Sequence, residues 1–425
     1  MSKEAIIKSL SNRFRELYGC EPEVIASAPG RLDFLNTHQD YKGLPVVSVG
    51  VNLRTYIALS RARRVSRIFS LNLAEIGLEH EDEFIVPDPP LREGKWFGNY
   101  LRASVKALFR LGIQVDNFNA LIYSEVPVAS GLASSAALLV SFVAGLNELF
   151  SIGLTRKQVA ETAYIAEHDV MGIPCGRLDQ YGSAFGGIIR IETRPPFRVE
   201  SLPWLNGVFI VMDSGIRHST ADIHPVRQRE INEGLKILLN MKGLPDDLRD
   251  KLAERYDLVK WDEISIDEIQ PYLEQLPETP RKRILYTLLA HRTTEIALDI
   301  MRGKKIDLNE LRRLLGRKWE KQIDKALGRD DIREALVGII MNYQHGLLRD
   351  LYDLSLPRLE EIWKASLEAG AYGSKLSGAG LGGSLIALSR SSNAEKIVRA
   401  SILAGARMAK TVLIDEGYRI EYVSR

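Results

Sequence analysis

The chain has 425 residues, of which 45% are hydrophobic and 26% charged, a composition typical of a soluble globular protein with two or three domains. Its 57 basic and 55 acidic residues give a formal net charge of +2, so charge does not indicate a nucleic-acid partner. The only two cysteines, Cys20 and Cys175, exclude a disulfide framework. The start, MSKEAIIKSLSNRF, lacks the apolar core of a signal peptide, and we therefore expect a cytoplasmic protein without a membrane partner.

The first part of the chain is dominated by strand patterns. Alternating and β-branched runs predict strands at 24–29, 44–62, 68–77 and 118–126, and the segment GRLDFLNTHQDYKG at 30–43 is expected to be a polar loop between two of them. A capping box formed by Thr155 and Gln158 then predicts the start of a helix.

Further strands are expected at 186–192, 207–215, 384–389 and 418–424, with long amphipathic helices such as 284–301 and 356–370 between the second and third of these. Strands and helices without regular alternation predict an α+β fold in two domains, 1–200 and 201–425, with the last strand packing back on the first domain. The border is expected in the proline-containing segment ETRPPFRVESLPW.

Three segments have the composition of functional sites. In PVASGLASSAALLVSF, 127–142, small residues and serines precede an apolar helix, so that backbone N–H groups would face an anion. The run GAGLGG at 378–383 matches a dinucleotide pattern, but a helix precedes it and a strand follows, which argues against a Rossmann site. Glu167 and Asp179 are carboxylates among small and apolar residues, where an unpaired charge is costly.

These segments together resemble the GHMP small-molecule kinases and, within them, the galactokinases. The second GHMP motif is matched around Gly131 and the third around Gly380. The segments that resemble galactokinases more specifically are AEHDVMGIPCGRLDQYGSA (166–184), RHSTA (217–221), NYQHGLLRDLYDLSLPRLE (342–360) and WFGNYLRA (96–103).

The resemblance implies a two-domain GHMP kinase fold with the active site in the cleft between the domains, and ATP and Mg²⁺ as cofactors. It implies that Asp179 accepts or orients the proton of the attacking hydroxyl, that Arg31 stabilises the developing charge, and that Ser135 and Glu167 hold Mg²⁺. The residues implied to bind the sugar are Asp33, Thr37, His38, Asp40, Gly176 and His224. Those implied to bind the nucleotide are Trp96, Ser130, Gly131, Leu132, Ala133, Ser134, Ser135, Gly378, Ala379 and Gly380.

Besides the conservative Leu35 in place of isoleucine, the polar loop departs from the galactokinase pattern G-R-x-N-x-I-G-E-H-x-D-Y at three positions. Asp33 stands where the family has asparagine, Asn36 where it has glycine, and Thr37 where it has the glutamate that helps to bind the sugar's 6-hydroxyl. His224 aligns with a sugar-binding tyrosine of the family. The loss of one charge-assisted hydrogen bond costs about 1.5–3 kcal/mol, enough to change which sugar is preferred.

The expected activity is therefore ATP-dependent phosphorylation of the anomeric hydroxyl of galactose or a related sugar. The same chemistry on arabinose, a uronic acid or an amino sugar is one alternative, and a sugar sensor that lost catalysis is another. A GHMP kinase for a non-sugar alcohol or a phosphorylated acid is disfavoured by the H-x-D-Y loop. The segment from Lys318 to Leu336 is longer than the family's usual spacing and has no assigned role, and the sequence does not determine the oligomeric state.

Overall fold

The computed structural model describes residues 2–128, 130–217 and 220–424, which form two compact units. Unit 1 comprises Met1–Leu32, Val49–Gly187 and Asp415–Arg425, and unit 2 comprises Asp33–Ser48 and Ile188–Ile414. The sequence suggests a single border between the domains near residue 200, whereas the contacts in the structure divide the chain at four points. Strands β1 (Val24–Leu35) and β2 (Val46–Arg61) each contain one of these points.

Unit 1 is built on a sheet with the strand order β12-β1-β2-β5-β3-β4. The C-terminal strand β12 pairs antiparallel with the start of β1, so Val24 lies opposite Val423. β2 and β5 are antiparallel, whereas β3 and β5 are parallel. The other strands on this path are β3 (Ser66–Ser70), β4 (Glu81–Phe84), β5 (Phe118–Ser124) and β12 (Arg419–Val423). Two more strands, β6 and β7, join the same eight-stranded sheet off this path, where β6 pairs with β2 and with β7.

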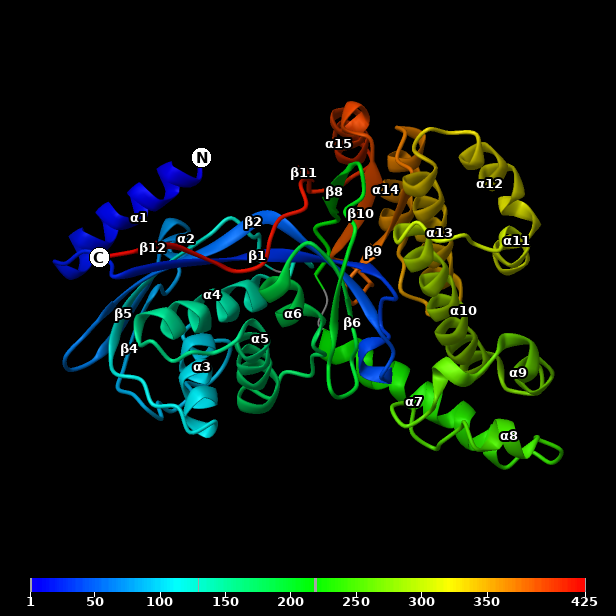
Figure 1. Cartoon of the computed structure of the whole chain (residues 1–425), viewed down its shortest axis with the longest axis horizontal. Coiled ribbons are helices and arrows are strands. Elements are labelled where there is room, and N and C mark those ends of the chain that lie inside the picture. The colour runs from blue at the N-terminus through cyan, green and yellow to red at the C-terminus, as the bar shows by residue number, and fades with distance from the viewer. Residues whose placement is uncertain (1, 129, 218–219, 425) are drawn as a thin grey trace. The chain divides into compact units, whose positions relative to one another are not determined.

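Alternation along the strands of unit 1 directs two sets of apolar side chains to opposite faces of the sheet. Ile25 and Tyr56 pack with helix α1 (Lys3–Tyr18) in one core, and Ala26 and Ile57 pack with other helices in a second core. Figure 1 shows α1 on one side of these strands and α3 to α6 on the other. The helices beyond α1 are α2 (Leu71–Glu75), α3 (Asn99–Arg110), α4 (Ser134–Leu149), α5 (Arg156–Ile165) and α6 (Leu178–Phe185).

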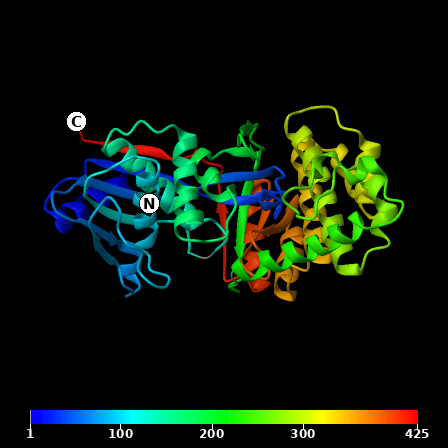
Figure 2. The ribbon, with the colours of Figure 1, turned by 90° about the horizontal axis from the view of Figure 1, so that it is seen from below.

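Unit 2 combines an antiparallel sheet of order β11-β8-β10-β9 with a group of helices. Helices α14 and α15 contact this sheet, and α10 packs against α7 and α13. Figure 2 shows the green to yellow helices of this unit gathered together. Its strands are β6 (Ile188–Ile191), β7 (Val199–Leu202), β8 (Val208–Asp213), β9 (Gly373–Ser377), β10 (Ser384–Ser389) and β11 (Met408–Val412). Its helices are α7 (Thr220–Leu239), α8 (Asp246–Arg249), α9 (Ile266–Leu273), α10 (Glu278–Met301), α11 (Leu308–Leu315), α12 (Glu320–Leu327), α13 (Ile332–Asp350), α14 (Pro357–Glu368) and α15 (Ala394–Leu403).

The α+β fold predicted from the sequence is confirmed, and so is the capping box, in which the Thr155 hydroxyl accepts from the N–H of Gln158. Two local predictions are wrong. Residues 30–35 belong to β1 rather than to a loop, because polar and apolar residues alternate there and both kinds are buried. Residues 71–75 form α2 rather than a strand, and Asn72 in this helix bonds through its amide to both backbone groups of Ser124. Within the described ranges, no helix is both long and apolar enough to cross a membrane.

Candidate functional site

The two groups implied in catalysis, Arg31 and Asp179, are in direct contact within unit 1. Nε and Nη2 of Arg31 donate to Oδ1 of Asp179 at 2.9 and 2.6 Å. Nη1 of Arg31 donates to the carbonyl of Gly131 at 2.7 Å, and its backbone N–H donates to the carbonyl of Leu132. The arginine side chain is 6% exposed and the aspartate side chain 28%, so the carboxylate is the group of this pair that solvent reaches more readily.

Arg31 thereby links the aspartate to the serine-glycine segment that precedes α4. Helix α4 begins at Ser134 with no side-chain cap, and its N-cap residue Ala133 has a left-handed backbone with φ of 55°. Gly131 also has a positive φ of 76°, which glycine adopts without strain. The hydroxyl of Ser130 donates to the carbonyl of Pro127 at 2.7 Å and braces the turn. The uncapped N–H groups of this 16-residue helix form an end of positive potential suited to an anion.

Glu167 lies in a single π-helical turn, Ala166–Val170, that follows α5. Its carboxylate is 5% exposed and accepts a bond from Nε2 of Gln180 at 2.6 Å. Burial and, next, the nearby charge of Asp179 raise the pKa of Glu167 to about 7, although hydrogen bonds from Ser135 and Gln180 oppose the rise. Ser135, Glu167 and Asp179 are thus neighbours, and the buried carboxylate of Glu167 lies near the partly exposed carboxylate of Asp179.

Two other residues implied by the resemblance also lie in unit 1. Gly176 is half-buried in the turn before α6, the helix whose first turn carries Asp179. Trp96 is half-buried, with the guanidinium of Arg92 at 4.0 Å from the centre of its ring. The indole Nε1 of Trp96 is buried without a protein partner among the described residues.

In unit 2, two of the residues that depart from the galactokinase pattern, Asp33 and Thr37, bond to each other. The hydroxyl of Thr37 donates to Oδ1 of Asp33 at 3.0 Å and accepts from Nζ of Lys375 at 2.7 Å. The lysine also donates to the carbonyls of Asp33 and Leu376, at 3.1 and 2.7 Å. Thr37 is 2% exposed and Lys375 is fully buried, so the hydroxyl of Thr37 is used inside the protein.

His38 joins the sugar motif to the third motif within the same unit. Its Nε2 lies 3.0 Å from the carbonyl of Ala379, which only accepts, so Nε2 carries the hydrogen and Nδ1 accepts from the hydroxyl of Tyr41 at 3.3 Å. Burial lowers the pKa of His38 well below its usual range, which agrees with this neutral form. The ring of His224 lies 4.9 Å from the rings of both His38 and Tyr41, so the structure brings these three residues together. Asp40, at the start of a 3₁₀ turn, is partly exposed.

The third motif forms a glycine loop between β9 and β10. Gly378 and Gly380 have φ of 92° and 85°, and Gly382 and Gly383 have φ of 141° and 68°, so all four glycines of this loop adopt a conformation that other residues rarely take. A Cβ on Gly380 would lie 2.7 Å from Cβ of Leu354, whereas a Cβ on Gly378 would meet nothing within 4 Å. The space beside Gly378 is therefore open, so that a ligand could approach the backbone of the loop there.

Two contacts, one in each unit, were missed from the sequence. Gln180, which bonds to Glu167, follows Asp179 directly and could have been suggested by that adjacency. Lys375 gave no usable signal, because it is a single lysine within the short strand β9 and only the fold brings it to Thr37. Ala129 of the serine-glycine segment and His218 and Ser219 of RHSTA lie outside the described residues.

Three family models match parts of the chain. The GHMP kinases N terminal domain matches residues 99–187, the galactokinase galactose-binding signature residues 12–61, and the GHMP kinases C terminal model residues 325–402. These matches include the segment before α4, the loop of Thr37 and His38, and the glycine loop. With the α+β fold and the Arg31–Asp179 pair, they define the class of protein as a GHMP kinase.

Comparison with whole proteins narrows this class. The chain is 30% identical to a galactokinase of Roseiflexus over 393 residues, covering 91% of this chain and 88% of that one, and 28% identical to a human galactokinase over 399 residues, covering 91% and 88%. This chain belongs to the galactokinase family of sugar kinases. Its fold matches the crystal structure of Lactococcus lactis galactokinase complexed with galactose, with a TM-score of 0.75, 21% identity and 97% and 99% of the two chains covered. A Methanococcus jannaschii mevalonate kinase shares the fold at a TM-score of 0.61 and 16% identity, covering 93% and 99%.

Proposed function

We propose that this protein transfers the γ-phosphoryl group of ATP to the anomeric hydroxyl of galactose or a related sugar. The observation that carries the proposal is the fixed Arg31–Asp179 pair. Nε and Nη2 of the arginine both bond to the same oxygen, Oδ1, and no described residue donates a hydrogen bond to Oδ2. Oδ2 is therefore the oxygen that would accept the proton of the attacking hydroxyl.

The charge of Arg31 supports this role in two ways. Its guanidinium holds the carboxylate in place through two charge-assisted hydrogen bonds, and it adds positive charge close to the segment before α4. Phosphoryl transfer depends mainly on positioning and on neutralising charge, and the uncapped N–H groups of α4 would supply both to the phosphates of ATP. Trp96, which belongs to the same unit, would contact the rest of the nucleotide.

The donor set also supports a magnesium ion at Ser135 and Glu167. A carboxylate and a hydroxyl are oxygen ligands of the kind that Mg²⁺ prefers, and Mg²⁺ usually takes few protein ligands beside phosphate and water. The raised pKa of Glu167 marks a carboxylate that lacks compensation for its charge, which a cation would provide. When bound, the ion would neutralise charge on the phosphates.

The bonds of Thr37 favour a range of acceptor sugars wider than galactose alone. Since this hydroxyl donates to Asp33 and accepts from Lys375, Thr37 does not replace the family's glutamate as a free partner for a 6-hydroxyl. A galactose-like sugar without that hydroxyl, such as arabinose, should then react with kcat/KM within about tenfold of galactose, because little binding is lost with the group.

The test is a panel of galactose, arabinose, galacturonic acid and galactosamine, followed by ATP turnover and by detection of a sugar 1-phosphate. For the best acceptor, Asp179→Asn should lower kcat by about 10²- to 10⁴-fold, because an amide does not accept the proton. Glu148→Gln, an exposed change on α4, is the control and should leave kcat unchanged.

Near-normal turnover by Asp179→Asn would show that the assigned general base is wrong. A protein that binds a sugar of the panel but turns over none of them would support the alternative of a sugar sensor. The expected cytoplasmic location remains a prediction, which fractionation of cells that express the protein would test.

A further inference from the structure

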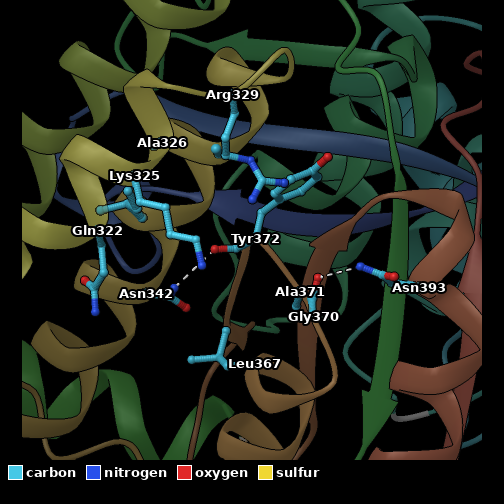
Figure 3. A pocket seen from close by; sticks show the side chains of 12 residues that line it. Gln322, Lys325, Ala326, Arg329, Asn342, Leu367, Gly370, Ala371, Tyr372 and Asn393 are labelled. Carbon is cyan, nitrogen blue, oxygen red and sulfur yellow. Dashed lines mark hydrogen bonds between the residues drawn. The ribbon is translucent and has the colours of Figure 1, made fainter.

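A cavity of about 430 Å³ lies in unit 2, and none of the residues assigned above to sugar, nucleotide or metal lines it. It is formed by α12, by α13 and by the segment that joins α14 to β9. Its volume falls in the range of small-molecule sites. Figure 3 shows Lys325 extending from α12 into the space beside Asn342 and Tyr372. Its lining therefore includes part of the segment Lys318–Leu336, to which the family resemblance assigns no role.

The lining is positively charged. Of the described residues that surround this cavity, two are basic, Lys325 and Arg329, and none is acidic. Arg329 donates to Asp331 at 2.6 Å, but the same carboxylate also pairs with Arg390, so one carboxylate serves two arginines. Lys325 forms no ion pair with any described residue. The cationic charge at the cavity thus exceeds the charge that compensates it, which favours an anionic ligand.

A second cavity, of about 460 Å³, adjoins the first, and Gln322 and Asn342 line both. Three of its lining residues are aromatic: Trp319, Tyr343 and Trp363. Large aromatic side chains provide surfaces against which a sugar or base ring packs. Next to the cationic cavity, these residues could hold the ring of a ligand whose anionic group lies near Lys325.

We propose that the two cavities form one binding site for a small molecule that carries a phosphate group and a ring. The phosphate contacts Lys325 and Arg329, and the ring lies on the side of Trp319 and Trp363. A nucleoside monophosphate and a sugar phosphate share this chemistry, and the choice of probes distinguishes them. Neither Arg31 nor Asp179 lines the two cavities.

Titration calorimetry on the full chain tests this site with uridine 5′-monophosphate, galactose 1-phosphate and inorganic phosphate as separate probes. Lys325→Glu should weaken binding of one ring-bearing probe by about tenfold or more, because it removes a charge-assisted contact and adds a repulsive charge. The matched control is Lys321→Glu, an exposed residue on the same helix that lines neither cavity, and it should change Kd less than about twofold. Gln322→Trp, which fills the junction of the cavities, should also weaken binding.

The control distinguishes this site from the catalytic one. If a probe binds only at the catalytic residues, Lys325→Glu and Lys321→Glu should change its Kd equally. That outcome would overturn the proposal, and so would the absence of binding tighter than about 1 mM by both ring-bearing probes. Inorganic phosphate that binds as tightly as either would overturn the role given to Trp319 and Trp363. If Lys325→Glu weakens the binding of only one of the two ring-bearing probes, the result would support the site and identify its ligand as the nucleotide or as the sugar phosphate.

Discussion

Replacement of Glu167 by glutamine should make the ligand-free protein more stable, and increasingly so as the pH rises. In the unfolded chain this carboxyl has its ordinary pKa near 4.5, whereas burial and the charge of Asp179 raise its pKa in the folded protein to about 7. Between these values the unfolded state releases the proton first, so the free energy of unfolding falls as the pH rises, and the loss is complete above the folded pKa. Glutamine keeps the shape of the side chain but carries no charge.

The size of the effect follows from the two pKa values. A rise from 4.5 to about 7 corresponds to about 3 kcal/mol, because one pKa unit is worth about 1.4 kcal/mol. For a unit of this size, 1 kcal/mol changes the melting temperature by about 2–4 °C. The melting temperature of Glu167→Gln should therefore equal that of the parent near pH 4.5 and exceed it by about 6–12 °C at pH 8.

Scanning calorimetry from pH 4.5 to 8, without nucleotide or metal, is the assay. Glu148→Gln is the matched control, because this exposed glutamate lies on α4 and its loss should give no pH-dependent difference. At pH 8, MgCl₂ with ATP should stabilise the parent more than Glu167→Gln, since only the parent has a carboxylate for the ion. A difference between Glu167→Gln and the parent that stays constant with pH, or that decreases as the pH rises, would refute the reasoning.

Three further changes should have measurable effects. Arg31→Lys should lower kcat by about 10- to 100-fold in steady-state kinetics, because lysine cannot bond to the carboxylate of Asp179 and to the carbonyl of Gly131 at once. An unchanged kcat would contradict the role given to Arg31. Thr37→Val should lower stability by about 1–3 kcal/mol in urea unfolding, because a buried ammonium and a buried carboxylate each lose a partner. Gly380→Ala should lower the melting temperature more than Gly378→Ala, because both changes strain the backbone but only the added Cβ at position 380 meets Leu354. Equal decreases in melting temperature would argue against that contact.

The sequence alone was sufficient to predict the class of fold and the family. The capping box at Thr155 depends on residues three positions apart, and the strands depend on local alternation, so both are written in short stretches of chain. The same locality explains the errors. The polar residues in GRLDFL led to the prediction of a loop where the structure has a strand. A fully buried strand holds polar side chains when the fold supplies their partners, and the partner of Arg31 is Asp179, 148 positions away.

The tertiary structure decided which of the residues in the motifs interact. The identity of Thr37 shows a departure from the family, but only the fold brings Lys375 within 2.7 Å of it, across 338 positions of sequence. The raised pKa of Glu167 likewise depends on burial and on the charge of Asp179, neither of which composition reveals. Residue types along the chain therefore determined which chemical groups this protein has available. Packing between distant segments determined which of these groups are bonded, buried or free to react, because those properties depend on distance in space and not on distance along the chain.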